Sequence, residues 1–163
     1  MPNKIKLTYF NFRGRAEASR LMLAYKGVEY EDCRITQDQW AALKPKTPFG
    51  SLPLLCYNGM ELAQSMTIAR FLARELNLAG KTRCEEACVD MVVDCVVDLF
   101  AAFTKLFVEK DETKKAELTE KMQKETVPNA MCNLEAILCK NGGCCMVGND
   151  VRFFLQFFYH KSF

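Results

Sequence analysis

The chain has 163 residues, of which 50% are hydrophobic and 26% are charged, and its formal net charge is +2 at pH 7. This composition supplies enough apolar side chain for a folded core and excludes disordered and collagen-like chains. The 22 basic and 20 acidic residues are interspersed, so the charge pattern indicates neither nucleic acid nor an anionic membrane surface as a partner.

The sequence gives no sign of a membrane span, an export signal or a metal site. No apolar run reaches the roughly 18 to 20 residues that a span requires, and the N-terminus lacks a signal-peptide core, so we expect a cytoplasmic protein. The nine cysteines recur at helix-face spacings, which favours free, buried thiols, with Cys144 and Cys145 the most reactive. A single histidine, His160, and the lack of paired CxxC ligands argue against bound metal.

The first part of the chain predicts a strand, a helix and a second strand. Residues 5–10 alternate apolar and polar side chains and are rich in strand formers. Residues 15–26 carry apolar side chains at helical intervals, and Gly27 supplies the expected stop. With a strand over residues 28–35, this order makes a βαβ unit.

A short helix, a hairpin and a longer helix are expected next. Residues 37–43 predict the short helix, and residues 52–57 and 60–62 predict two strands. The Asn58-Gly59 dipeptide between these strands is a strong signal for a tight hairpin turn. Ser65 is then expected to cap a helix that runs to about residue 76.

Polar and breaker residues at 77–82 form the only plausible linker, so we predict two domains, residues 1–79 and 82–163. Beyond the linker, spacings of three and four predict one long amphipathic helix. The residues expected to face inward on it are Cys88, Met91, Val92, Cys95, Val96, Leu99, Phe103 and Phe107.

A second long helix is expected after a charged turn at residues 109–115, and it should run to about Lys140. Its predicted inward residues are Met122, Met131, Leu134 and Leu138. After the breakers at residues 141–143, residues 151–163 form an aromatic-rich tail with no clean period, which is an aggregation hazard if it is exposed.

The order βαβ, short helix, ββα suggests a thioredoxin-like domain followed by an all-helical one. In such a domain the proline before the third strand is characteristically cis, and Pro53 occupies that place. Thiol-disulfide enzymes of this fold need a cysteine after the first strand, whereas residues 9–15 contain none. The nearest polar group at that strand end is the phenol of Tyr9, although a tyrosine in a strand is more often a plain core or surface aromatic.

Three segments together resemble the sigma-class glutathione transferases, a class that includes the glutathione-dependent prostaglandin D synthases. The segments are NFRGRAE at residues 11–17, PFGSLP at 48–53 and LAQSMTIARFL at 62–72. The resemblance begins at Met1, is strongest through Lys81 and weakens along the long helices to about Asn149.

The resemblance implies roles for individual residues, each of which also has a plainer structural explanation. Tyr9 would bond the glutathione sulfur and favour the thiolate, and Arg15 would add positive field unless it only forms a surface ion pair. Gln64 and Ser65 would bind the γ-glutamyl end at a helix start, where Ser65 could instead be a simple N-cap. The remaining implied contacts to glutathione come from Trp40, Lys44, Gly50, Ser51, Leu52 and Pro53, and from the partner subunit's Asp98, with Asp94 a further candidate.

Two departures from the family pattern accompany these matches. Ser51 stands where the family often has lysine or glutamine, so a weaker contact is expected there. After Asn149 the family continues with a capping box that opens a buried helix, whereas this chain continues with Asp150 and Val151. We therefore expect an incomplete helical domain that is marginally stable.

The resemblance implies a homodimeric enzyme that adds the glutathione thiolate to apolar electrophiles, with glutathione as co-substrate and no tightly bound cofactor. Prostaglandin-H2 D-isomerase activity would use the same thiolate and is left open by these residues. The alternative is a non-catalytic protein, either a binder of glutathione or hydrophobes or a structural, crystallin-like relative.

Overall fold

The structure is a computed structural model that describes residues 4–149 of the chain. The chain divides into two compact units, with the boundary between Ala79 and Gly80. The predicted aromatic tail at residues 151–163, which includes His160, lies outside the described residues. No helix in the described part of the chain is long and apolar enough to cross a membrane.

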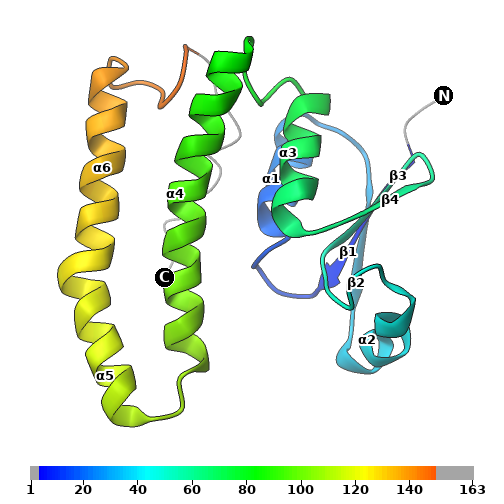
Figure 1. The fold of residues 1–163 in the computed structure, drawn as a ribbon. Helices are drawn as coiled ribbons and strands as arrows, with labels where there is room; N and C mark the ends of the chain where they lie inside the picture. Colours follow the sequence, from blue (N-terminus) through cyan, green and yellow to red (C-terminus); the bar gives the residue numbers. More distant parts are fainter. Residues whose placement is uncertain (1–3, 150–163) are drawn as a thin grey trace. The chain divides into compact units, whose positions relative to one another are not determined.

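The first unit is built on a mixed sheet of four strands (Figure 1). The strands are β1 (Ile5–Phe10), β2 (Glu31–Ile35), β3 (Leu54–Tyr57) and β4 (Met60–Ala63), in the order β2-β1-β3-β4. β1 pairs in parallel with β2 and antiparallel with β3, which in turn pairs antiparallel with β4. This topology confirms the thioredoxin-like fold expected from the order of elements.

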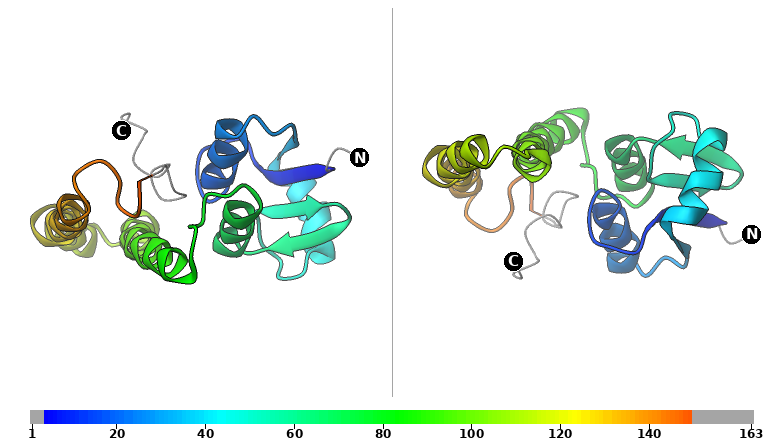
Figure 2. Two further views of the ribbon diagram at one scale, coloured as in Figure 1. Left: turned by 90° about the horizontal axis from the view of Figure 1, so that it is seen from above. Right: turned by 90° about the horizontal axis from the view of Figure 1, so that it is seen from below.

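Helices cover this sheet on both sides (Figures 1 and 2). α1 (Glu17–Tyr25) and α3 (Ser65–Glu75) pack together against one face, whereas α2 (Gln37–Leu43) and the 3-10 turn Lys44–Lys46 lie on the other side. The apolar face shared by α1, α3 and the sheet forms the core. Its fully buried large side chains include Leu7, Met22, Leu23, Leu55, Ile68 and Leu72.

Two turns of the first unit form where glycine allows a positive φ. Gly27 has φ 61°, and the amides of Gly27 and Val28 bond the carbonyls of Ala24 and Leu23, which is a Schellman ending for α1. Asn58 and Gly59 have φ 51° and 86° and join β3 to β4 in a two-residue hairpin. Both predicted turns are thus confirmed.

The second unit is an antiparallel helical pair (Figure 1). Its first member is α4 (Arg83–Val108), capped by the Thr82 hydroxyl. The chain turns back into α5 (Glu112–Lys121), whose N-cap carboxylate, from Asp111, accepts bonds from the amides of Thr113 and Lys114. A π-helical turn, Met122–Thr126, then leads into α6 (Val127–Lys140).

The π-helical turn ends two residues before Pro128, which is the second residue of α6. Proline has no amide hydrogen to donate, and its ring clashes with the carbonyl four residues earlier in a regular α-helix. A π turn widens the helix at that point and relieves this conflict. The second long helix predicted from sequence is therefore present, but with an irregular turn in its middle.

The predicted inward face of α4 is only partly correct. Val92 and Val96 are buried as expected, together with Val89 and Val93. Met91, Phe103 and Phe107, which were expected to face inward, are 56%, 41% and 89% exposed. In the second helical run Met122 and Leu134 are buried, whereas Met131 is 45% exposed. Helical spacing predicts which residues share a face, but it does not determine how far along the helix that face is covered.

All nine cysteines are free, as expected, but the prediction that they are buried is wrong for most of them. Only Cys145 is buried among the nine, all of which lie in the described part of the chain. The exposed thiols are those of Cys84, Cys88, Cys132, Cys139 and Cys144. Spacings of four and seven put these residues on common helix faces, and those faces are turned to solvent.

Candidate functional site

The sheet register brings three predicted site residues to one edge of the sheet. Thr8 of β1 pairs with Leu54 of β3, and Leu54 pairs with Ala63 of β4. Neighbouring strands lie about 4.8 Å apart, so the next residue along each strand lies on the same edge. Those next residues are Tyr9, Pro53 and Gln64.

Tyr9 occupies this edge as a nearly buried side chain, with 6% of its surface exposed. Its phenol oxygen accepts a hydrogen bond of 3.3 Å from the backbone N–H of Arg15. The rings of Phe10 and Phe12 meet it edge-on, with centroids 5.7 and 5.4 Å away. A phenol that accepts through its oxygen still has its own proton to donate, so Tyr9 is arranged to donate to an anion.

Gly14 makes this arrangement sterically possible, and no role was expected for it from sequence. A Cβ atom at Gly14 would lie 3.1 Å from the Tyr9 hydroxyl oxygen and 3.2 Å from Cε2 of Phe12. Both separations are tighter than ordinary carbon contacts. A side chain at this position would therefore press on the phenol.

Arg15 reaches Tyr9 through its backbone, while its side chain is exposed. Among the residues that the structure describes, none forms the surface ion pair with Arg15 that was considered as its plainer role. The guanidinium is thus a cation available near the end of β1.

Trp40 and Lys44 lie on the α2 side of the sheet. The half-buried Trp40 ring meets Phe10 edge-on, with centroids 6.2 Å apart at 82°. α2 is held at its start by a reciprocal capping box between Thr36 and Gln39. The stem of Lys44 passes Gly50, where an added Cβ would lie 3.6 Å from Cε of the lysine. Gly50 has φ 58°, a conformation that glycine adopts readily.

The peptide bond between Leu52 and Pro53 is cis, as the fold predicts. Pro53 is buried and leads directly into β3, whereas Ser51 and Leu52 are half-buried. The backbone of residues 51–52 therefore adjoins the sheet edge that carries Tyr9.

Gln64 and Ser65 form the start of α3, but their roles differ from the expected ones. Gln64, and not Ser65, is the N-cap, and it makes no side-chain capping bond. Gln64 has φ 72° and ψ 115°, which is an uncommon conformation for a residue with a side chain. The first turn of α3 also contains no acidic residue. Its amides and the helix dipole therefore favour an external carboxylate.

Asp94 and Asp98 lie one helical turn apart on α4 in the second unit, and both are exposed. The predicted contact between the partner subunit's Asp98 and glutathione stays a prediction.

Arg20 is a buried cation at this site that sequence reasoning missed. The residue is 5% exposed and lies 5.8 Å from the centre of the Tyr9 ring. Burial lowers the pKa of Arg20, but hydrogen bonds to Glu17 and Asp32 outweigh that effect, and its pKa is raised above the ordinary value. The signal available in the sequence was the spacing of Glu17 and Arg20, which puts an ion pair on one face of α1.

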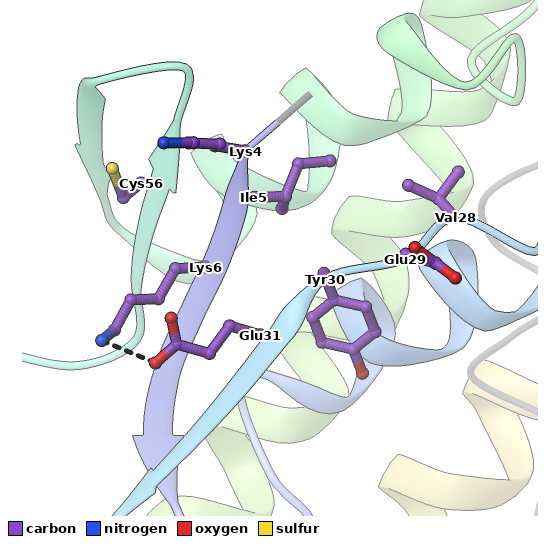
Figure 3. A pocket seen from close by; sticks show the side chains of 8 residues that line it. All are labelled: Lys4, Ile5, Lys6, Val28, Glu29, Tyr30, Glu31 and Cys56. Atoms are coloured by element: carbon purple, nitrogen blue, oxygen red, sulfur yellow. Dashed lines mark ion pairs between the residues drawn. The ribbon is translucent and has the colours of Figure 1, made fainter. Parts of the chain in front are cut away.

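A cavity of about 870 Å³ opens near the start of β1, at the other end of the strand from Tyr9 (Figure 3). Lys6 and Glu31 form a 2.7 Å ion pair in its wall, with side chains that are 45% and 62% exposed. None of the predicted glutathione contacts lines this cavity. Its lining residues are Lys4, Ile5, Lys6, Val28, Glu29, Tyr30, Glu31 and Cys56.

Two family descriptions match the chain. Residues 5–74 match the glutathione S-transferase N-terminal domain, and residues 97–153 match the glutathione S-transferase C-terminal domain. The sequence is similar to human hematopoietic prostaglandin D synthase, with 40% identity over 151 residues, which covers 93% of this chain and 73% of the relative. It is also similar to glutathione S-transferase 1 of Ascaris suum, with 42% identity over 149 residues, which covers 90% and 72%.

The fold agrees with solved structures of the same kind. The structure of prostaglandin synthase D of Nilaparvata lugens superposes with a TM-score of 0.87 and 36% sequence identity, covering 95% of this chain and 77% of that one. The glutathione S-transferase of Ascaris lumbricoides superposes with a TM-score of 0.83 and 42% identity, covering 93% and 75%.

Proposed function

Because the chain belongs to the glutathione transferase family and is sigma-like within it, we propose that it binds glutathione at the sheet edge formed by Tyr9, Pro53 and Gln64. The chain is a glutathione transferase whose reaction joins the glutathione sulfur to an apolar electrophile. Tyr9 donates its phenol proton in a hydrogen bond to that sulfur.

The observation that carries this proposal is the bond from the Arg15 amide to the Tyr9 oxygen. This bond supports the phenol as a donor, because an oxygen that accepts one hydrogen bond becomes a better donor through its own proton. A hydrogen bond to the charged form of a thiol lowers its pKa from about 8.5. More thiolate, which is the reactive nucleophile, then exists at neutral pH.

The rest of the peptide fits along the same edge. The γ-glutamyl carboxylate is placed at the start of α3, beside Gln64 and Ser65, where the amides lack a side-chain cap. The cysteinyl portion bonds the backbone of Leu52 in the manner of an added strand. The glycyl carboxylate pairs with Lys44 beside Trp40, and Gly50 and Ser51 complete that side.

The domains and the assembly belong to the same proposal. The predicted domain at residues 1–79 binds glutathione, and the predicted domain at residues 82–163 is the incomplete helical one. Two chains form a homodimer, in which the partner subunit's Asp98 reaches the amino group of glutathione. We place the protein in the cytoplasm.

A second candidate activity is isomerisation of prostaglandin H2 to prostaglandin D2. The observation that favours it is the similarity to hematopoietic prostaglandin D synthases of human, chicken and mouse, at 40% to 41% identity. In that reaction the same thiolate attacks one endoperoxide oxygen and the O–O bond breaks, so that the other oxygen takes up a proton and becomes a hydroxyl group. Loss of the proton from the carbon that carries the attacked oxygen then forms the ketone, breaks the S–O bond and returns the thiolate. Neither the fold nor the comparisons favour the non-catalytic, crystallin-like alternative.

The proposal is tested by passing the purified 163-residue chain over immobilised glutathione, eluting it with free glutathione and assaying conjugation to an aryl halide. Retention with turnover is expected. Retention without turnover would overturn the catalytic assignment. A folded sample that passes through unretained would overturn glutathione binding as well.

A further inference from the structure

The side chain of Arg20 bonds the main chain of the segment that follows Tyr9. Its Nη1 donates to the carbonyl oxygen of Phe12 at 3.2 Å, and its Nη2 donates to that of Phe10 at 3.3 Å. Its Nε and Nη1 also bond Asp32 and Glu17, each at 3.1 Å. All three guanidinium nitrogens are thus used, and two of them bond the loop directly.

Arg34 bonds Asn11, the residue between Phe10 and Phe12. Its Nη1 donates to Oδ1 of Asn11 at 2.8 Å, and its Nε donates to Oδ2 of Asp32 at the same distance. The two oxygens of Asp32 therefore each bond a different arginine, Arg20 through Oδ1 and Arg34 through Oδ2. We call this arrangement of Arg20, Asp32 and Arg34 the Asp32 clamp.

The Asp32 clamp bonds three consecutive residues, Phe10, Asn11 and Phe12, of which Phe10 ends β1 and the other two begin the loop that leads to Gly14. This short segment connects Tyr9 to the Arg15 amide that bonds its phenol. That bond is 3.3 Å long, already at the outer limit for N–H···O bonds. A loop shift of a few tenths of an ångström is therefore enough to break it.

We propose that Asp32 is a positioning residue for the reaction, and this proposal rests on the proposed function of Tyr9. By joining Arg20 to Arg34, Asp32 keeps the loop in the conformation in which the Arg15 amide supports the Tyr9 hydroxyl. Asp32 acts through the loop and touches neither glutathione nor the electrophile. It thereby sets how strongly Tyr9 stabilises the thiolate.

The test compares the parent chain with Asp32→Asn, which keeps the shape of the side chain but replaces one acceptor oxygen with a donor group. The apparent pKa of the bound thiol is read from the dependence on pH of kcat/KM for the electrophile, measured at saturating glutathione. An increase of about one unit is expected, with roughly tenfold lower kcat/KM below that pKa, because each unit leaves tenfold less thiolate. A merely structural role for Asp32 would lower the yield of folded protein and leave this pKa unchanged.

Glu31→Gln is the matched control. Glu31 is the preceding residue of β2, and its carboxylate pairs with Lys6 at 2.7 Å instead of with the loop. Its pH profile should equal that of the parent. In a Tyr9→Phe background, Asp32→Asn should produce no further increase in the pKa of the thiol, because the group that it positions is gone.

Asn11→Ala provides a second route if Asp32→Asn does not fold. Asn11 is exposed, and Asn11→Ala removes only the hydrogen bond from Arg34 to the loop. A smaller change in the same direction is expected. Equal pH profiles for the parent, Glu31→Gln and either clamp variant would overturn the clamp alone. Absence of turnover in the parent would overturn both the clamp and the proposed function.

Discussion

A methyl group on Gly14 would lie 3.1 Å from the hydroxyl oxygen of Tyr9. The main chain at Gly14 thus passes so close to the phenol that an added side chain would make an unusually tight contact. Since φ at Gly14 is not positive, the demand for glycine here comes from this contact and not from backbone conformation.

Gly14→Ala should therefore lower kcat/KM for conjugation while the protein stays folded. The new methyl group displaces the phenol from the Arg15 amide and from the sulfur. The loss should be much smaller in a Tyr9→Phe background, where no hydroxyl remains to be displaced. Equal losses in the two backgrounds, measured as kcat/KM at one pH, would contradict a steric effect on Tyr9.

Tyr9→Phe should lower conjugation and leave glutathione binding nearly intact. A hydrogen bond to a charged group contributes about 1.5–3 kcal/mol, which corresponds to roughly 10- to 150-fold in rate. The pKa of the bound thiol should increase, so activity should recover as the pH is raised. The measurements are the pH profile of kcat/KM and retention on immobilised glutathione. Unchanged turnover would remove Tyr9 from the mechanism.

Gln64→Gly should weaken glutathione binding without weakening the fold. Gln64 has φ 72°, where a side chain costs on the order of 1 kcal/mol that glycine does not incur. The contacts of the glutamine side chain with the γ-glutamyl end are lost, so KM for glutathione should increase by roughly tenfold. Titration with glutathione and urea denaturation measure the two effects.

Asn77→Gly is the control for that experiment, because Asn77 also has a positive φ, 55°, and lies beyond the C-terminal end of α3. It should show the same small change in stability with no change in KM. A loss of stability in Gln64→Gly that matches its loss of affinity would mean that Gln64 only supports the fold.

Local patterns account for what the sequence predicted well in the first unit. Alternation marked β1 over its full length, and the Asn58-Gly59 dipeptide marked the hairpin, because both signals depend on neighbouring residues alone. The expectation of a cis bond at Pro53 came from the order of elements, and the structure has it.

Predictions failed where the outcome depends on distant parts of the chain. Phe107 continues the apolar face of α4, yet it is 89% exposed. Periodicity places a residue on a face of a helix but carries no information about what covers that face. Arg20 owes its role to Asp32 on β2, twelve residues further along, and neither residue has a local signature of that contact. Ser65 resembled a cap, but the conformation of Gln64 moved the start of α3 by one residue.

Tyr30 makes a prediction about stability in alkali. Burial, assisted by the nearby charge of Asp32, raises the pKa of Tyr30 above its ordinary value. Above pH 10 the unfolded chain therefore loses this phenol proton while the folded chain still holds it, so the free energy of unfolding falls as pH rises through this window. Tyr30→Phe removes this contribution, and its stability should decline less steeply than that of the parent.

The measurement is urea denaturation at about pH 8 and pH 11, with Tyr25→Phe as the matched control because its ring is 56% exposed. Lys6, whose pKa is also raised, remains in both variants and adds the same decline to each, whereas Arg20 stays protonated at both pH values. The difference between the two variants therefore reports Tyr30 alone. Equal declines in Tyr30→Phe and Tyr25→Phe would show that the half-buried phenol of Tyr30 does not contribute to the loss of stability.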